Sequence, residues 1–390
     1  MPRIPADKCC GCTACFAACP CAAIEMKADS EGFMYPVVDG DKCIGCGCCE
    51  KVCPVITPPE VSGGIIDCVI AQHTDGKVLS ESTSGGFLDA LCKHITNNMG
   101  GYAAGVAFNE DFMPVHRIAD NYADARAFRN SKYAQSDMGN VFAQVRGILD
   151  DGGTVLFIGT PCQAAGLRNY IGNDRDKLYI ADLVCRSVPS PEFWRSYLDW
   201  QKKRNDSGIL SVRCRSKTYG YHSGALEIGF ANGKRYAGSN RVDYFMKSFH
   251  SDICSRPSCY DCPFKTLERV SDFTVFDSWS PQAASLEPLN DNDRGYSNVL
   301  IRTEKGRRIL ETMTDVRVFR ADADRLMAFT GGMERRSVER KPARDSFFAD
   351  LNRMGFEKTV RKYVRVTLFD RVIEAMKPAR YYIKKRLSRR

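Results

Sequence analysis

The stretch “DKCCGCTACFAACPCAAI”, residues 7–24, places six cysteines within thirteen positions, and “DKCIGCGCCEKVCPVI”, residues 41–56, adds five more. Each stretch contains the pattern C-x₂-C-x₂-C-x₃-C-P. Three thiolates at this short spacing can wrap one cubane in a tight turn, while the fourth points to the other cluster. The duplication therefore predicts two [4Fe–4S] clusters, the first held by Cys9, Cys12, Cys15 and Cys53 and the second by Cys43, Cys46, Cys49 and Cys19.

Zinc is the alternative metal, because it also binds four cysteines supplied as C-x₂-C pairs. Zinc ribbons use two separated pairs, however, and give no reason for a third C-x₂-C step or for a cysteine followed by proline. The duplicated run therefore favours iron–sulfur chemistry. Cys10, Cys21 and Cys48 lie outside the pattern, and we expect small buried side chains or neighbours of the ligands at these positions.

Composition places the chain among globular proteins. Its 390 residues, 44% of them hydrophobic, can bury a large core, and the length predicts two or three domains. No run of about twenty apolar residues occurs, and charged, cysteine-rich sequence begins near Met1, so we expect neither a membrane span nor a signal peptide. We therefore predict a cytoplasmic location, where the 19 cysteines favour metal ligation over disulfides.

The net charge of +9 is concentrated at one end of the chain. The last fourteen residues, “KPARYYIKKRLSRR”, carry seven Lys or Arg and no acid, which leaves only +2 (9 minus 7) for the rest. Each cluster with its four thiolates would add a net charge of about −2, so we expect no basic nucleic-acid groove. The interleaved Tyr381, Tyr382, Ile383 and Leu387 leave a membrane-surface or RNA-binding helix as alternatives to a solvated basic terminus.

The pattern changes after the cysteine runs. Between the runs, “EMKADSEGFMYPVV” alternates loosely around a glycine and suits a short hairpin, and “PVITPPEVSGG” is typical of a linker. From Asp67 onward, apolar strands alternate with helical stretches. We predict an α+β protein with a small bacterial-type 2[4Fe–4S] ferredoxin module (residues 1–58), a linker (59–66), a larger α/β domain (67–325) and a helical, basic extension (326–390).

Two consecutive strand–turn–helix units stand out in the body. In “GGTVLFIGTPCQAAGLRNYIG”, residues 155–158 fit a buried strand, 159–161 a turn and 163–170 a helix. In “KLYIADLVCRSVPSPEFWRSYLDWQ”, a strand runs through Val184 and a helix begins with Ser190 as cap and Pro191 as first residue. Cys162 and Cys185 follow the two strands, and ligands bind where parallel strands end, so we expect both thiols at the same edge of the sheet.

A third cysteine group can complete a site with these two thiols. “CSRPSCYDCPFK” supplies the pair Cys259 and Cys262, which is half of a four-thiolate site, and precedes another strand, “SDFTVFDSW”. Cys162 and Cys185 are the natural second half. Cys254 remains an alternative ligand, and zinc an alternative metal. Three further cysteines lie inside strand-like or helical runs and are expected to be packing residues: Cys68, Cys92 and Cys214.

A stretch of small residues, Ser82 to Gly86, precedes apolar residues at helical spacing in “STSGGFLDALCKHITNNMGG”. Such a stretch exposes backbone N–H groups at a helix N-terminus and suits a phosphate, although an ordinary helix cap looks the same.

Several motifs together resemble the coenzyme F420 hydrogenase/dehydrogenase beta-subunit family. They are “SKYAQS” (131–136), “GTPCQAAGLR” (159–168), “DLVCRSVPSP” (182–191) and “RPSCYDCPF” (256–264), and the match continues through “GYSNVLIRTEKG”. The resemblance spans roughly residues 65 to 320. With a ferredoxin module in front, the chain is similar to the bacterial branch associated with surface-polysaccharide biosynthesis.

The resemblance implies that the α/β domain binds FAD beside a [4Fe–4S] cluster on Cys162, Cys185, Cys259 and Cys262. Carried over by position, the flavin contacts would be Ser84, Gly85, Gly86, Ser131, Lys132, Tyr133, Gly159, Thr160 and Gln163. A lysine near a flavin ring or its phosphates can stabilise negative charge. Lys132 and Asp277 are therefore the candidate catalytic residues.

Two departures from the family pattern bear on the chemistry. Where the pattern reads Cys-His-Gly, this chain has Cys185, Arg186 and Ser187, so a histidine that could donate a proton is absent. Where the pattern has Gly-Asp-Phe-Trp-Gly, the chain reads “FDSWS” (276–280), and the missing glycines would limit how closely backbone approaches a ligand.

We therefore predict an iron–sulfur flavoprotein oxidoreductase. Clusters carry single electrons and a flavin can collect two, so the set would connect a ferredoxin or another redox protein to a small-molecule or glycan-related substrate. One alternative is an electron-relay subunit whose partner holds the substrate site. Another is a scaffold that keeps the clusters without flavin or catalysis.

Overall fold

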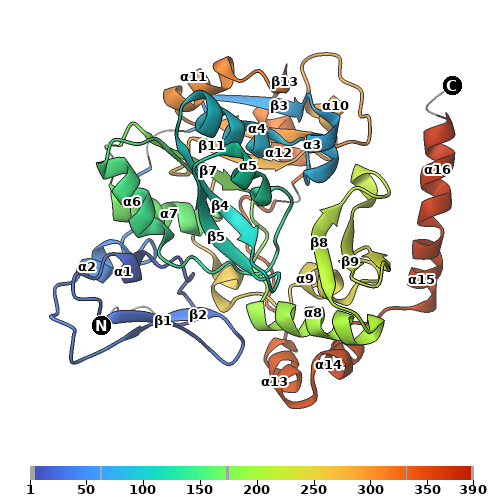
Figure 1. Ribbon diagram of the computed structural model, residues 1–390, viewed down its shortest axis with the longest axis horizontal. Coiled ribbons are helices and arrows are strands. Elements are labelled where there is room, and N and C mark those ends of the chain that lie inside the picture. The colour runs from blue at the N-terminus through green and yellow to red at the C-terminus, as the bar shows by residue number, and fades with distance from the viewer. Residues whose placement is uncertain (1–4, 62–63, 173–174, 331, 388–390) are drawn as a thin grey trace.

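The computed structural model describes residues 5–61, 64–172, 175–330 and 332–387 (Figure 1). Residues 62–63 of the predicted linker and 388–390 of the basic C-terminus lie outside these ranges. Within the described part of the chain, no helix is both long and apolar enough to cross a bilayer.

The cysteine-rich module contains two short helices and an antiparallel hairpin, namely α1 (Ala14–Ala17), β1 (Ile24–Ala28), β2 (Met34–Val38) and α2 (Cys48–Lys51). The predicted hairpin is thus confirmed. The two cysteine runs also share one backbone turn. Gly11 and Thr13 have φ of 68° and 67°, and Gly45 and Gly47 have φ of 68° and 71°. The sequence duplication is therefore a duplicated left-handed turn around Cys12 and Cys46.

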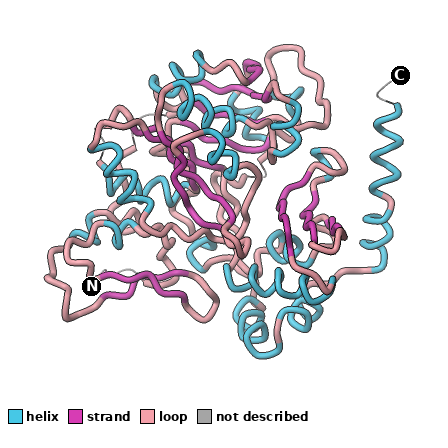
Figure 2. The backbone as a smooth tube through the Cα atoms, viewed as in Figure 1, coloured by secondary structure: helices cyan, strands magenta, loops and turns pink. Residues whose placement is uncertain are grey.

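An eight-stranded mixed sheet forms the body, in the order β13-β3-β12-β11-β7-β6-β4-β5 (Figure 2). Its members are β3 (Asp67–His73), β4 (Tyr102–Phe108), β5 (Pro114–Ala119), β6 (Val155–Gly159), β7 (Leu178–Leu183), β11 (Phe273–Asp277), β12 (Ser297–Ile301) and β13 (Val316–Arg320). The central strands β4, β6, β7 and β11 are mutually parallel, while the other pairings are antiparallel. This arrangement confirms the predicted α/β body and its buried strands.

Capping residues determine where the helices after β6 and β7 begin. In α7 (Pro161–Ile171), Gln163 Oε1 accepts the N–H of Thr160 at 2.9 Å, so the helix starts at Pro161, two residues earlier than predicted. In α8 (Pro191–Asn205), Ser190 is the N-cap and accepts the N–H of Phe193, as predicted.

Further helices line the sheet: α3 (Gly76–Glu81), α4 (Phe87–Lys93), η1 (His94–Asn98), α5 (Tyr122–Ala125), η2 (Arg126–Phe128), α6 (Val141–Asp150), α10 (Pro281–Ala284), α11 (Glu304–Thr312) and α12 (Ala323–Ala328). Apolar residues on both sheet faces form the core with them.

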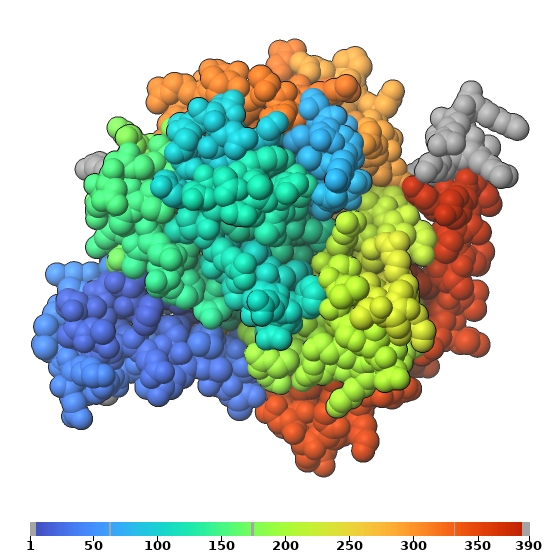
Figure 3. Space-filling view, in the orientation of Figure 1, coloured from blue at the N-terminus to red at the C-terminus, as the bar shows by residue number. Residues whose placement is uncertain are grey.

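A second sheet and several helices complete the body. They are β8 (Ile209–Ser216), η3 (Tyr221–Ser223), β9 (Ala225–Phe230), β10 (Arg235–Gly238), α9 (Tyr244–His250), η4 (Pro257–Asp261), α13 (Arg344–Met354), α14 (Phe356–Tyr363), α15 (Leu368–Ala375) and α16 (Lys377–Leu387). Phe347 and Phe356 pack on Phe193 of α8, with ring centroids 5.2 and 5.3 Å away. Phe33 of the hairpin joins the same core through Phe348. Residues 344–364 therefore pack as part of the body, whereas α15 and α16 run along its outer edge (Figure 3).

Candidate functional site

The residues predicted for the first cluster come together in the cysteine-rich module. All four thiols, from Cys9, Cys12, Cys15 and Cys53, line one cavity. Burial, followed by the neighbouring Cys9 and Cys53, raises the pKa of Cys15 to about 12. Cys53 belongs to the second run of the sequence, so the fold brings together the four thiols that the spacing assigns to one cluster, and their ligation of iron stays a prediction.

The four residues predicted for the second cluster differ from the first set in their exposure. Cys43 and Cys46 are exposed, and Cys19 and Cys49 are half-buried. Cys19 Sγ accepts the N–H of Ala23 at 3.2 Å. These four residues are accessible from solvent to a degree that the first set is not, because Cys12 and Cys53 of the first set are buried.

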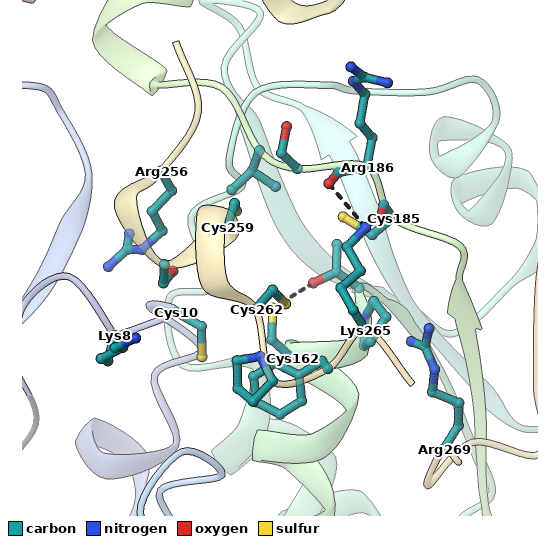
Figure 4. Close-up of a pocket in the computed structure, with 17 residues that line it drawn as sticks. Lys8, Cys10, Cys162, Cys185, Arg186, Arg256, Cys259, Cys262, Lys265 and Arg269 are labelled. Atoms are coloured by element: carbon teal, nitrogen blue, oxygen red, sulfur yellow. Dashed lines mark hydrogen bonds between the residues drawn. The ribbon is translucent and has the colours of Figure 1, made fainter. Parts of the chain in front are cut away.

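Four thiols of the body line another cavity (Figure 4). Cys162 lies in the first turn of α7, Cys185 follows β7, Cys259 lies in η4 and Cys262 ends η4. The sequence predicts this convergence at the ends of neighbouring strands. Within the described ranges, no three His, Cys, Asp or Glu side chains converge closely enough to hold a single metal ion; the four thiols stand around the walls of the cavity instead.

Basic side chains surround these thiols. Burial raises the pKa of Cys185 to about 12 and that of Cys262 to about 11, while the positive charges of Lys265 and Arg269 act in the opposite direction. Lys265 also donates to the backbone oxygens of Cys185 and Met333, so it is fixed beside the thiols. The cavity is lined by five cations in all: Lys8, Arg186, Arg256, Lys265 and Arg269. Four thiols surrounded by cationic side chains fit a metal cluster that, together with its thiolates, carries net negative charge.

Cys254, the alternative ligand, packs elsewhere. Its side chain is fully buried in the aromatic core with Phe249 and Ile253, and its pKa is raised by burial. Three more cysteines, Cys68, Cys92 and Cys214, are buried in apolar clusters, as predicted.

Cys10 is a fifth thiol at the body cavity, and it also lines the cavity of the first cysteine set. The Cys12 thiol beside it and burial raise the pKa of Cys10, and the Cys162 thiol opposes this from the other side. In Figure 4, Cys10 projects from the module toward Cys162. Its position outside the ligand pattern gave no sign of this role at the joint between module and body.

Arg256 fastens the module to the body. Its buried guanidinium donates to the backbone oxygens of Cys9 (2.8 Å) and Met34 (3.0 Å) and to Gln135 Oε1 (2.7 Å). It also lies 4.2 Å from the ring centroid of Tyr35. Cys9 directly precedes Cys10, the residue that lines both cavities. Arg256 therefore sets the position of the first cysteine set relative to the body.

The residues expected to contact a flavin form two groups. In one, Thr83 Oγ1 lies 3.0 Å from Ser131 Oγ, and Ser84 Oγ lies 2.9 Å from Ser297 Oγ. Gly85 has a packing reason of its own, because a Cβ there would lie 2.2 Å from the backbone oxygen of Ala71. Gly86 has φ of 78° and precedes α4.

The other group lies beside the body thiols. Thr160 Oγ1 is 3.2 Å from Cys162 Sγ. Gln163 Nε2 donates to Ser136 Oγ at 3.2 Å, so the segment 131–136 reaches from Ser131 in the first group to this second group. Gly159 ends β6 next to Thr160, where a Cβ would lie 2.7 Å from the Phe157 ring.

The lysine that contacts the stretch from Ser82 to Gly86 is Lys217, which the sequence pattern does not single out. Its ammonium donates to the backbone oxygens of Ser84 (2.5 Å), Arg294 (2.6 Å) and Leu79 (2.8 Å). Lys132 instead donates to the backbone oxygens of Ala127 and Arg129, at 2.8 and 2.7 Å. Burial lowers the pKa of Lys132 and of Lys217 to about 7.

Asp277, at the end of β11, lies among aromatic and basic side chains. The Arg215 guanidinium is 4.7 Å from the ring centroid of Trp279, and the Tyr221 ring stacks on Trp279 at 5.1 Å. Arg215 Nε is buried without a hydrogen-bond partner among the described residues, whereas burial and the neighbouring Asp277 raise the pKa of the Tyr221 hydroxyl. Buried polar atoms are normally paired, so Arg215 Nε is suited to a polar ligand.

At the position where the resemblance expects histidine, Arg186 pairs with Asp252. Its Nε and Nη2 each lie 2.9 Å from an oxygen of that carboxylate, and Nη2 donates to the backbone oxygen of His250 at 3.0 Å. Burial, Arg186 and Arg215 together lower the pKa of His250 to about 4. The imidazole next to this position is therefore neutral at pH 7. At the other departure, neither Ser278 nor Ser280 adopts a positive φ.

Comparisons with known proteins match two parts of the chain. Residues 152–324 match the family model for the C terminus of the beta subunit of coenzyme F420 hydrogenase/dehydrogenase, and residues 8–56 match that of a 4Fe-4S dicluster domain. Among solved structures, a chain of the F420-reducing [NiFe] hydrogenase complex from Methanosarcina barkeri is similar, with 18% identity, coverage of 77% of this chain and 91% of that chain, and a TM-score of 0.44. No curated protein matches. The chain is thus an iron–sulfur redox protein that joins a 4Fe-4S dicluster domain to a C-terminal domain of the coenzyme F420 hydrogenase/dehydrogenase beta-subunit family.

Proposed function

We propose that the chain is an iron–sulfur flavoprotein oxidoreductase that passes electrons between a ferredoxin-like donor, three [4Fe–4S] clusters and FAD. Its substrate would be a small molecule or a glycan-related compound, and the resemblance to the bacterial branch of the family suggests a role in surface-polysaccharide biosynthesis. Clusters exchange single electrons, and FAD can exchange one or two electrons. Together they can convert one-electron transfer into two-electron transfer, or the reverse. The observation that carries the proposal is the cavity of Cys162, Cys185, Cys259 and Cys262, which meets the dicluster domain at Cys10.

The arrangement of the cysteines supports an ordered set of sites. The exposed Cys43 and Cys46 are accessible to a redox protein, the first set faces the body, and Cys10 separates that set from the body thiols. A zinc ion at the body thiols would give no reason for this direct approach to a redox module. The location therefore favours a third iron–sulfur cluster there.

Residues in and around the stretch from Ser82 to Gly86 support an FAD site next to the third cluster. The Thr83 hydroxyl lies at the Ser131 end of the segment 131–136, and the Thr160 hydroxyl lies near its Ser136 end through Gln163. Lys217 donates to the backbone oxygen of Ser84. Within the described part of the chain, Arg215 Nε has no hydrogen-bond partner and could bind a polar atom of a ligand. These residues would bind and orient the cofactor, while Asp277 would lie close to it.

The composition of the purified protein tests this proposal. After anaerobic purification, we expect about twelve iron and one FAD per chain, from three four-iron clusters. Cys162→Ala should lower the iron content by about four while leaving the dicluster domain loaded. Eight iron with one zinc per chain would refute the third cluster, and iron without flavin would favour the non-catalytic scaffold.

The electron-relay subunit is a second candidate, and the ion pair of Arg186 with Asp252 favours it. This pair occupies the position where the resemblance expects a proton-donating histidine, and a guanidinium stays protonated at neutral pH. A relay would accept electrons from reduced ferredoxin, yet turn over glycan-related substrates only with a partner protein. Turnover by the purified chain alone would exclude it.

A further inference from the structure

The last two helices form one continuous rod at the edge of the body. Met376 N donates to Val372 O at 3.2 Å and Arg380 N donates to Met376 O at 3.1 Å, so helical hydrogen bonds cross the boundary between α15 and α16. A helix from residue 368 to 387 is about 30 Å long. Figures 1 and 3 show it on the side opposite the dicluster domain.

The acidic side chains of this rod face the body. Glu374 accepts the N–H and the O–H of Ser239, at 2.9 and 2.6 Å. Asp370 accepts a hydrogen bond from Lys247 at 3.1 Å and from Arg241 at 3.4 Å. Polar contacts, and not an apolar stripe, therefore attach the rod.

The apolar side chains of the rod face solvent. Leu368 is 78% exposed, Phe369 69% and Ile383 59%. At 3.6 residues per turn, Leu368 and Ile383 share one stripe with Val372 and Met376, each of which is 51% exposed. A surface helix normally turns such a stripe toward the core, so this orientation is reversed.

Positive charge accompanies the stripe. Arg371 and Arg380 are exposed, and helical geometry places them on opposite flanks of the stripe. The sequence from residue 377 to 390 contains seven Lys or Arg and no acid. Since the body engages Asp370 and Glu374, the outward side combines apolar and cationic groups, which is the composition of helices that lie in an anionic lipid interface.

We propose that α15 and α16 bind this protein to an anionic membrane surface, with the apolar stripe among the acyl chains and the flanking arginines at the lipid headgroups. A second copy of the chain is a poorer occupant, because pairing two identical stripes would bring their arginines together without acidic partners. Binding through this edge leaves the dicluster domain free on the opposite side (Figure 1).

Vesicle co-flotation of the full-length, cluster-loaded protein tests the proposal. We expect binding to vesicles of equal parts phosphatidylcholine and phosphatidylglycerol that weakens with added salt, and little binding to phosphatidylcholine alone. Leu368→Ser with Ile383→Ser should lower the partition coefficient at least about tenfold, because two exposed apolar side chains no longer enter the lipid.

A matched control uses another exposed leucine. Leu210 is 69% exposed on β8, and Leu210→Ser should bind vesicles like the wild type. Unchanged iron content and circular dichroism would verify that all variants fold. Binding that is equal for neutral and anionic vesicles, or that survives the double substitution, would overturn the proposal. So would a dimer in sedimentation velocity that the double substitution abolishes while wild type fails to bind vesicles.

Discussion

A methyl group at Gly166 should separate the dicluster domain from the body. Gly166 lies within α7, and a Cβ there would lie 2.7 Å from Cys12 Sγ and 3.0 Å from Cys12 Cβ. Real Cβ atoms do not approach so closely, and Cys12 is held by its own turn and is buried. Gly166→Ala must therefore push the first cysteine set away from α7.

Two effects of opposite sign decide the magnitude. Replacing glycine by alanine inside a helix stabilises it by about 1 kcal/mol. Overpacking a buried contact by one methyl group costs about 1–3 kcal/mol. The contact at Gly166 is closer than van der Waals distance to both Cys12 atoms, so we place the cost at the upper end and expect a net destabilisation of about 1–2 kcal/mol.

The helix α6 offers the matched control. Gly147 is exposed in α6, and nothing lies within 4 Å of a Cβ placed there. Gly147→Ala should therefore gain the helix stabilisation of about 1 kcal/mol without any packing cost. Iron content and thermal unfolding of anaerobic protein are the measurements. We expect Gly147→Ala to raise the melting temperature and Gly166→Ala to lower both melting temperature and iron occupancy. Full iron in Gly166→Ala, with a stability gain equal to that of Gly147→Ala, would refute the close approach of α7 to Cys12.

Other perturbations address the joint, a buried carboxyl and the duplicated turn. Arg256→Met should release the dicluster domain to limited proteolysis, because three buried hydrogen bonds are lost; the exposed Arg353→Met is its control. Burial raises the pKa of Asp243 to about 6, so the folded state binds more protons than the unfolded state at pH 4–6 and its stability falls by about 2–3 kcal/mol as pH rises through that window. Asp243→Asn should remove this slope in urea unfolding, and an unchanged slope would contradict the assignment. Thr13→Gly should be neutral or stabilising, whereas Gly47→Thr should cost about 1–2 kcal/mol in thermal unfolding, because both positions have a positive φ.

The sequence predicts which thiols share the two cavities because the determinants are local. Spacing within each run determines which thiols share a turn, and the repeat of strand, turn and helix determines that Cys162 and Cys185 leave the sheet at one edge. The same pattern predicts that Cys53, from the second run, joins the thiols of the first run. Cys53 indeed lines one cavity with Cys9.

The contacts between distant segments could not be predicted in the same way. Cys10 and Arg256 gain their roles only because the module docks on α7 and η4, and no spacing rule specifies that face. Lys217 reaches Ser84 from the loop after β8, more than 130 residues away. The stretch from Ser82 to Gly86 had two interpretations in the sequence, a phosphate site or an ordinary helix cap. Neither included packing, yet a Cβ at Gly85 would lie 2.2 Å from the backbone oxygen of Ala71.

The joint, and not the linker, sets the geometry between the dicluster domain and the body. Arg256 holds the backbone of Cys9, α7 contacts Cys12 through Gly166, and Phe33 of the hairpin is buried against Phe348. These contacts are distributed over the module, so we expect the predicted linker, residues 59–66, to need only enough length to connect the two parts. Changes in linker length should be tolerated, because a longer flexible loop costs little free energy. A single methyl group at Gly166 should not be tolerated, because it would press directly on Cys12, a predicted cluster ligand.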